Sequence, residues 1–143
     1  MRYLDTSFIA PYFLPEPTSA AIQKFMGEMP DGEIAISHWL RVEFASLLAL
    51  RRRVGTLNGN DALNAEAQFD AIVAVSMTVF MPTIDDFDLA RRYLSRHETG
   101  LRGGDALHLA IAANRRVEAV HSLDKTMLKA GATLGLPVSA GIR

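Results

Sequence analysis

The stretch Met1-Arg2-Tyr3-Leu4-Asp5-Thr6-Ser7 places a short apolar segment directly before an aspartate and two hydroxyl residues. Such a segment favours a β-strand, and Asp5 then favours the start of a helix because aspartate is a preferred N-cap. The same order returns far along the chain, where apolar residues from Ala119 onward lead to Asp124. These two stretches predict strand-then-helix units, which decide the fold class.

The rest of the chain continues this alternation. Strands are expected over Arg2–Leu4, Glu33–Ser37, Thr78–Met81, Ala119–Leu123 and Leu136–Ser139. Helices are expected after Thr18, over His38–Arg53, Asp61–Val75 and Thr83–His97, from Asp105 onward, and over Asp124–Ala130. Crossover helices must cover both faces of a parallel sheet, so the alternation predicts an α/β sandwich with a mostly parallel sheet.

The composition restricts the class of protein. A length of 143 residues with 49% hydrophobic content is enough for one well-filled core, so we expect a single domain over 1–143. The absence of cysteine excludes disulfides, thiolate metal sites and thiol nucleophiles. A net charge of −1 gives no basic footprint of a nucleic-acid binder. With neither a signal peptide nor a membrane-length apolar run, we expect a soluble cytoplasmic protein.

Three aspartates occur where ligands bind in open parallel sheets, beyond the carboxyl ends of the strands. Asp5 and Asp124 each follow an apolar strand, and Asp105 follows the Gly103-Gly104 turn and opens a helix. Each could simply cap its helix, a role that contributes about 1 kcal/mol. The spacing alone leaves capping and a shared site open.

Glu43 lies inside an expected helix, on its apolar side. Its neighbours one and two turns away are all apolar: Trp39, Leu40, Leu47 and Leu50. A carboxylate on that stripe faces inward, where an unpaired charge is costly. Glu43 therefore needs either an internal ion pair, for example with an arginine, or a bound cation.

The ligands available for a cation are oxygens. The four histidines, His38, His97, His108 and His121, show no metal-ligand spacing, although His108 shares a helix face with Asp105. Like charges about 4 Å apart repel by roughly 4 kcal/mol at an effective dielectric near 20, and a divalent cation relieves this repulsion. Oxygen ligands alone favour Mg²⁺ or Mn²⁺, the ions that support phosphodiester hydrolysis.

Four short motifs then occur in a fixed order along the chain. They are Tyr3-Leu4-Asp5-Thr6-Ser7, Arg41-Val42-Glu43-Phe44-Ala45, Asp105-Ala106-Leu107-His108-Leu109-Ala110 and Ser122-Leu123-Asp124-Lys125. In this order they resemble the acidic signature of the PIN-domain ribonucleases, in particular the VapC-type toxins of bacterial type II toxin–antitoxin systems. The resemblance covers essentially the whole chain.

This resemblance implies a three-layer α/β/α sandwich with a five-stranded sheet and a metal-dependent endoribonuclease that uses Mg²⁺ or Mn²⁺. It implies a homodimer and a cognate antitoxin that neutralises the toxin. The metal-site and catalytic acids would be Asp5, Glu43, Asp105 and Asp124. Ser7, Ser122 and His108 would lie next to them, with the two serines able to hold a metal-bound water. Thr126 and Met127 stand where some members carry a further acid, so we expect a second metal to be weakly held.

Substrate phosphates outside the acid site would need cations. The candidates are Arg51, Arg52, Arg53, Arg102, Arg115 and Arg116. The alternative to an enzyme is a catalytically inactive PIN-like RNA-binding or scaffold domain. Other phosphate enzymes fit less well: Asp5 lacks the second acid of a haloacid dehalogenase-like phosphatase, and the Gly-rich turn of a dinucleotide-binding domain is absent.

Overall fold

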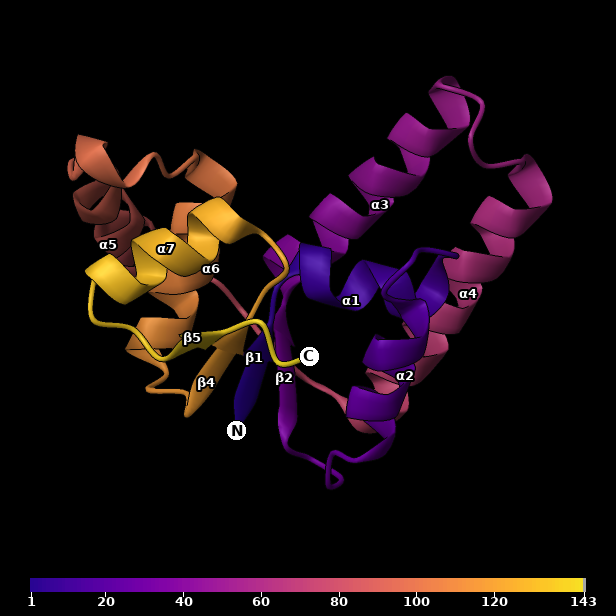
Figure 1. Cartoon of the computed structure of the whole chain (residues 1–143), viewed down its shortest axis with the longest axis horizontal. Helices are drawn as coiled ribbons and strands as arrows, with labels where there is room; N and C mark the ends of the chain where they lie inside the picture. Colours follow the sequence, from indigo (N-terminus) through magenta and orange to yellow (C-terminus); the bar gives the residue numbers. More distant parts are fainter. Residues whose placement is uncertain (143) are drawn as a thin grey trace.

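The computed structural model describes residues 1–142, which form one five-stranded sheet with helices on both faces (Figure 1). The strand order is β3-β2-β1-β4-β5, and every pair of neighbouring strands is parallel. Tyr3 of β1 is in register with Ala35 of β2 and with Val120 of β4, so β1 lies at the centre of the sheet. The parallel sheet predicted from the sequence is confirmed.

The strands are short and the helices account for most of the chain. The strands are β1 (Arg2–Leu4), β2 (Ile34–Ser37), β3 (Thr78–Phe80), β4 (Ala119–His121) and β5 (Val138–Ser139). The helices are α1 (Thr6–Phe13), α2 (Ser19–Gly27), α3 (His38–Arg53), α4 (Gly59–Ser76), α5 (Ile84–Leu94), α6 (Gly103–Asn114) and α7 (Lys125–Thr133), with a 3₁₀ turn η1 (His97–Thr99). None of the helices in residues 1–142 combines the length and the apolar character needed to cross a bilayer.

Alternating strand residues separate two cores, one on each face of the sheet. Leu4 and Ile36 point into a core formed with α1 to α4, where Phe44 and Phe69 stack at 4.4 Å between ring centroids. Tyr3 points into the opposite core, which is built largely from α5, α6 and α7. These two cores make the chain a three-layer α/β/α sandwich, as the resemblance implied.

Several predicted boundaries were wrong by a few residues. The helix expected to open at Asp105 starts at Gly103, and Arg102 rather than Asp105 is its N-cap. The helix expected from Asp61 starts at Gly59, because the Asn58 side chain accepts a hydrogen bond from the Asp61 N–H and caps it. The helix expected to reach His97 ends at Leu94 and is followed by η1. The end of α3 is as expected, since Gly55 follows it with a φ of +78°.

The strand order places a switch point between β1 and β4. From β1 the chain proceeds through β2 to β3 on one side, and it then returns to the other side of β1 with β4 and β5. Connections that leave two neighbouring strands in opposite directions open a crevice beyond their carboxyl ends. Asp5 directly follows β1, and Ser122 directly follows β4.

Candidate active site

Asp5 is held rigidly at the end of β1. Its carboxylate is 3% exposed and caps α1 by accepting from the Phe8 N–H at 2.9 Å. The Ser122 hydroxyl donates to Asp5 Oδ2 at 2.7 Å, and the Ser7 hydroxyl donates to Asp5 Oδ1 and Oδ2 at 2.9 and 3.0 Å. Burial raises the pKa of Asp5, and the nearby His108 charge and these hydrogen bonds oppose the rise.

The two serines therefore have a role that the sequence did not specify. Ser7 and Ser122 lie 3.2 Å apart, and each also accepts from the backbone of the β4–α7 loop, Ser7 from the Leu123 N–H and Ser122 from the Asp124 N–H. They join the start of α1 to the start of α7. In this structure both hydroxyls donate hydrogen bonds to the Asp5 carboxylate.

Glu43 faces inward from α3 toward the end of the sheet. Its carboxylate is an ion-pair partner of His108, with Nε2 at 2.5 Å from Oε2, and it accepts a hydrogen bond from the Thr6 hydroxyl. Burial alone would raise the pKa of Glu43, but the hydrogen bond and charge of His108, together with Thr6, lower it below its usual value. The positive partner that an inward glutamate requires is thus a histidine, not an arginine.

His108 connects Glu43 to the interior of the sheet. The ring is 1% exposed, and its Nδ1 lies 2.7 Å from the Tyr3 hydroxyl, which donates to Ser37 Oγ at 2.8 Å. The His108 ring thus lies between the Tyr3 hydroxyl and the Glu43 carboxylate. When it is protonated, it supplies a positive charge to the site.

Asp105 and Asp124 complete the group from two further helices. Asp124 caps α7 through the Met127 N–H at 3.0 Å, whereas Asp105 lies in the first turn of α6. Burial raises the pKa of Asp105, and the negative charges of Asp124, Asp5 and Glu43 raise it further. The other three predicted acids therefore lie close enough to act on Asp105, although the four come from four separate segments.

The close packing of α6 against α3 depends on Gly104. A Cβ atom at that position would lie 2.7 Å from Glu43 Oε1 and 3.4 Å from the indole of Trp39. The Trp39 Nε1 atom is buried and has no hydrogen-bond partner among the described residues. Tyr3, Thr6, Trp39 and Gly104 are the residues that sequence reasoning missed. Only Gly104 left a signal, as one of two glycines before an acid.

The donors fit a hard divalent cation in their chemistry. All four acids offer oxygen, which suits Mg²⁺ or Mn²⁺, and their mutual repulsion raises the pKa of Asp105. Within residues 1–142, no three acidic or histidine side chains are arranged so that they could hold a metal ion as they stand. Glu43 is engaged by His108 and Thr6, and Asp5 by Ser7 and Ser122, so binding a cation requires side chains to exchange these partners.

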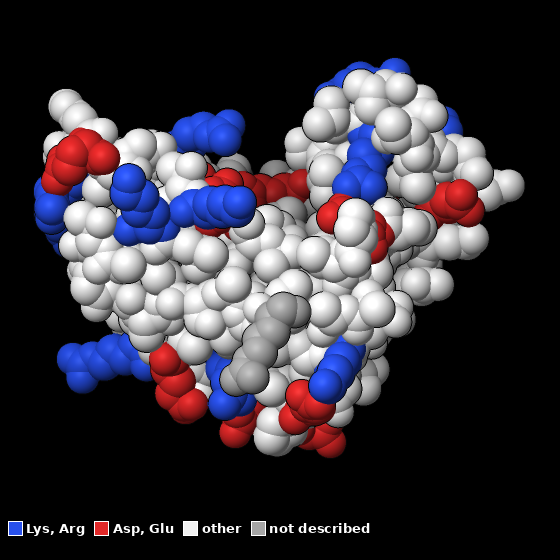
Figure 2. Space-filling view, viewed as in Figure 1, with Lys and Arg blue, Asp and Glu red and all other residues white. Residues whose placement is uncertain are grey.

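Acidic side chains gather at the bottom of an open hollow in the surface (Figure 2). Figure 2 shows acidic side chains between the arm formed by α3 and α4 and the part formed by α6 and α7, with basic side chains above them on both sides. Two of the candidate cations are engaged in the protein. Arg51 pairs with Glu16, and Arg115 pairs with the buried Asp86 at 2.6 Å. Hydrogen bonds from Asn114, the Thr83 N–H and Arg115 lower the pKa of Asp86 against the effect of burial.

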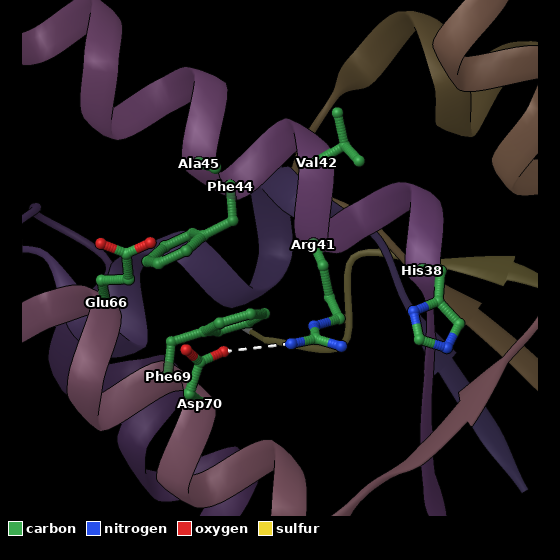
Figure 3. A pocket seen from close by; sticks show the side chains of 8 residues that line it. All are labelled: His38, Arg41, Val42, Phe44, Ala45, Glu66, Phe69 and Asp70. Carbon is green, nitrogen blue, oxygen red and sulfur yellow. Dashed lines mark hydrogen bonds and ion pairs between the residues drawn. The ribbon is translucent and has the colours of Figure 1, made fainter.

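A separate hollow lies between α3 and α4 (Figure 3). It has a volume of about 480 Å³, with Phe44 and Phe69 inside and Arg41 donating to Asp70 at 3.4 Å. Arg41 and Ala45 face this hollow, whereas Glu43 lies on the opposite side of the same helix. The hollow is therefore separate from the acids, and it holds no group poised for their chemistry.

The fold and the four acids define a class: a parallel α/β sandwich that presents carboxylates at the switch point of its sheet. A model of the PIN domain matches residues 2–132. The chain belongs to the PIN domain family. No curated protein matches it.

Solved structures show the same fold. The toxin VapC20 of Mycobacterium tuberculosis, which cleaves the sarcin–ricin loop, is 21% identical and has a TM-score of 0.73, and the match covers 95% of this chain and 96% of that one. FitAcB from Neisseria gonorrhoeae is 18% identical with a TM-score of 0.71, over 96% of each chain. FitAB bound to an IR36 DNA fragment gives the same identity and TM-score, over 97% of this chain and 94% of that one.

Proposed function

We propose that this chain is a VapC-type toxin, a metal-dependent endoribonuclease that hydrolyses RNA phosphodiester bonds. The observation that carries the proposal is the gathering of Asp5, Glu43, Asp105 and Asp124 near the switch point, where the negative charges of the other three acids raise the pKa of Asp105. Membership of the PIN family and the likeness to VapC20 support it. Mg²⁺ or Mn²⁺ bound by these acids would supply charge for the phosphate and an activated water.

The chain's own residues would prepare that site. Ser7 and Ser122 fix the Asp5 carboxylate, and His108 with Thr6 fixes Glu43. His108, when it is protonated, would also offset part of the negative charge that repels an RNA backbone. A bound cation would neutralise the remaining negative charge of the four carboxylates and of the RNA phosphate.

We also propose the partners that the likeness suggests. FitAB and FitAcB match over nearly the whole chain, and we expect a cognate antitoxin to bind and neutralise this protein. We further propose a homodimer, a cytoplasmic location and one domain over 1–143.

RNA cleavage by the purified chain tests the proposal. A labelled RNA should be cut with Mn²⁺ or Mg²⁺ and left intact with EDTA, and Asp105→Asn should reduce the rate by about 10²-fold or more. Asp88→Asn is the matched control, because Asp88 is an exposed aspartate on α5, and it should retain full activity. A rate that is insensitive to EDTA or to Asp105→Asn would contradict the proposal.

A second candidate is an inactive PIN-like domain that binds RNA or serves as a scaffold. The observation in its favour is that His108 and Thr6 already occupy the Glu43 carboxylate, while no acidic or histidine group in residues 1–142 is arranged to hold a metal. This candidate predicts no cleavage and no effect of Mn²⁺ on the melting temperature. An enzyme, in contrast, should cleave RNA and should show an effect of Mn²⁺ on its melting temperature.

A further inference from the structure

A pocket of about 400 Å³ adjoins the acids. Thr6, Ser7 and Asp124, which belong to the acid site, are among the residues that line it. Glu16 and Arg51 also line it. Among the described residues that line this pocket, Arg51 is the one that carries a positive charge.

Arg51 lies on the same face of α3 as Glu43. Glu43, Leu47 and Arg51 are spaced four residues apart, so they form one row along the helix, and Leu47 also lines the pocket. Eight residues of helix correspond to about 12 Å along its axis. Arg51 is therefore placed beside the acids without being among them.

The Arg51 guanidinium forms an ion pair with the Glu16 carboxylate, which belongs to the loop between α1 and α2. Both side chains are 26% exposed, so an anion in the pocket can reach the pair. A guanidinium has five N–H donors, and one carboxylate does not use them all. Glu16 thus orients Arg51 and leaves donors for a second anion.

We propose that Arg51 binds a backbone phosphate of the RNA next to the phosphate that lies among the four acids, and that Glu16 competes with this phosphate for the guanidinium. The inference rests on the proposed function, since it places the cleaved strand along the pocket. Four acids repel a polyanion, and a guanidinium matches a phosphate through paired hydrogen bonds. Arg51 is then a substrate-binding residue, distinct from the acids.

RNA binding without turnover tests this assignment. In an Asp105→Asn background with Mg²⁺, the fluorescence anisotropy of a short labelled single-stranded RNA gives Kd at several salt concentrations. Arg51→Gln should weaken binding roughly tenfold and reduce the slope of log Kd against log salt by about 0.7, the value for one phosphate contact to a single strand. Arg92→Gln is the matched control, because Arg92 is an exposed arginine on α5 and does not line the pocket.

Glu16→Gln provides a prediction of opposite sign. Removing the competing carboxylate should tighten RNA binding several-fold. If the pair only fastened the α1–α2 loop to α3, both Arg51→Gln and Glu16→Gln would lower the melting temperature and leave the salt slope unchanged. That result, equal losses for Arg51→Gln and Arg92→Gln, or no RNA binding at low salt would overturn the inference.

The failure of this inference can be separated from failure of the proposed function. Cleavage by the unmodified chain with unchanged RNA binding in Arg51→Gln would reject the role of Arg51 and leave the nuclease intact. Arg51-dependent RNA binding without metal-dependent cleavage would reject the nuclease and leave the phosphate contact.

Discussion

At the scale of single residues, the pKa values of the site's carboxylates are shifted in opposite directions. Burial raises the pKa values of Asp5 and Asp105, and the neighbouring negative charges raise that of Asp105 further, whereas His108 and Thr6 lower the pKa of Glu43. The sequence predicted the inward position of Glu43, because a period of 3.6 residues fixes which side of a helix is apolar. It did not predict the contact between His108 and Tyr3, since residues 105 positions apart meet only through the sheet.

Asp105→Asn should stabilise the metal-free protein at neutral pH. Because folding raises the pKa of Asp105, its charge costs stability once the pH rises from about 3.8 through the folded pKa. The favourable position of a negative charge in the first turn of α6 contributes about 0.3–1 kcal/mol and opposes this cost. We expect the melting temperature in EDTA to rise by about 2–4 °C at pH 7, and by less near pH 4.

Calorimetric melts at both pH values check this expectation, with Asp88→Asn as the control for loss of a surface charge. An unchanged or lower melting temperature for Asp105→Asn at pH 7 would mean that repulsion among the acids is not significant.

At the scale of elements, the sequence predicts the alternation of strands and helices well and the first residues of the helices less well. The sequence identified all five strands and the start and end of α3, because apolar runs and a C-terminal glycine mark them. It misplaced the start of α6, since Gly103-Gly104 is typical of a turn. The glycine at 104 serves packing instead, by letting α6 approach Glu43 and Trp39.

Gly104→Ala should damage the site more than the fold. The new Cβ would lie 2.7 Å from Glu43 Oε1, so the carboxylate must move away from its position. Gly103→Ala is the matched control, because a Cβ there meets nothing within 4 Å and alanine favours a helix by up to about 1 kcal/mol.

We expect Gly104→Ala to reduce the affinity for Mn²⁺ and the cleavage rate at least tenfold, while Gly103→Ala leaves both intact and raises the melting temperature slightly. Calorimetric titration and RNA cleavage measure these effects. Equal activity in the two variants would show that the position of Glu43 is not critical.

At the scale of the molecule, the two cores decide which apolar residues of α4 and α5 are buried. Phe69 and Val73 face the core on α4, but Leu63 is 66% exposed, and on α5 Ile84 and Phe87 are 79% and 52% exposed. Helical periodicity predicts which side of a helix is apolar, but it does not predict where the layer packed against that side ends. Leu63, Ile84 and Phe87 lie beyond the end of that layer.

His121 makes the stability of the fold depend on pH. Its ring is 6% exposed between Phe8 and Phe25, and neither ring nitrogen has a partner among the described residues. Burial lowers its pKa, and the charge of Arg2 lowers it further, so stability is lost as the pH falls below the unfolded pKa of about 6.5. Folding raises the pKa values of Asp5 and Asp105, so the protonation of these two carboxylates at lower pH increases stability and opposes the effect of His121.

The difference between the unmodified chain and His121→Leu isolates this effect. Between pH 7.5 and pH 5, urea unfolding in EDTA should show the unmodified chain losing stability relative to the variant. A constant difference across that range would mean that His121 titrates alike in the folded and unfolded states.

The central claim is that the four acids bind a divalent cation, and calorimetric titration of Mn²⁺ tests it most directly. The unmodified chain should bind Mn²⁺, Asp5→Asn should lose that binding, and Asp88→Asn should keep it. Absence of binding to the unmodified chain, or equal binding to Asp5→Asn, would contradict the claim.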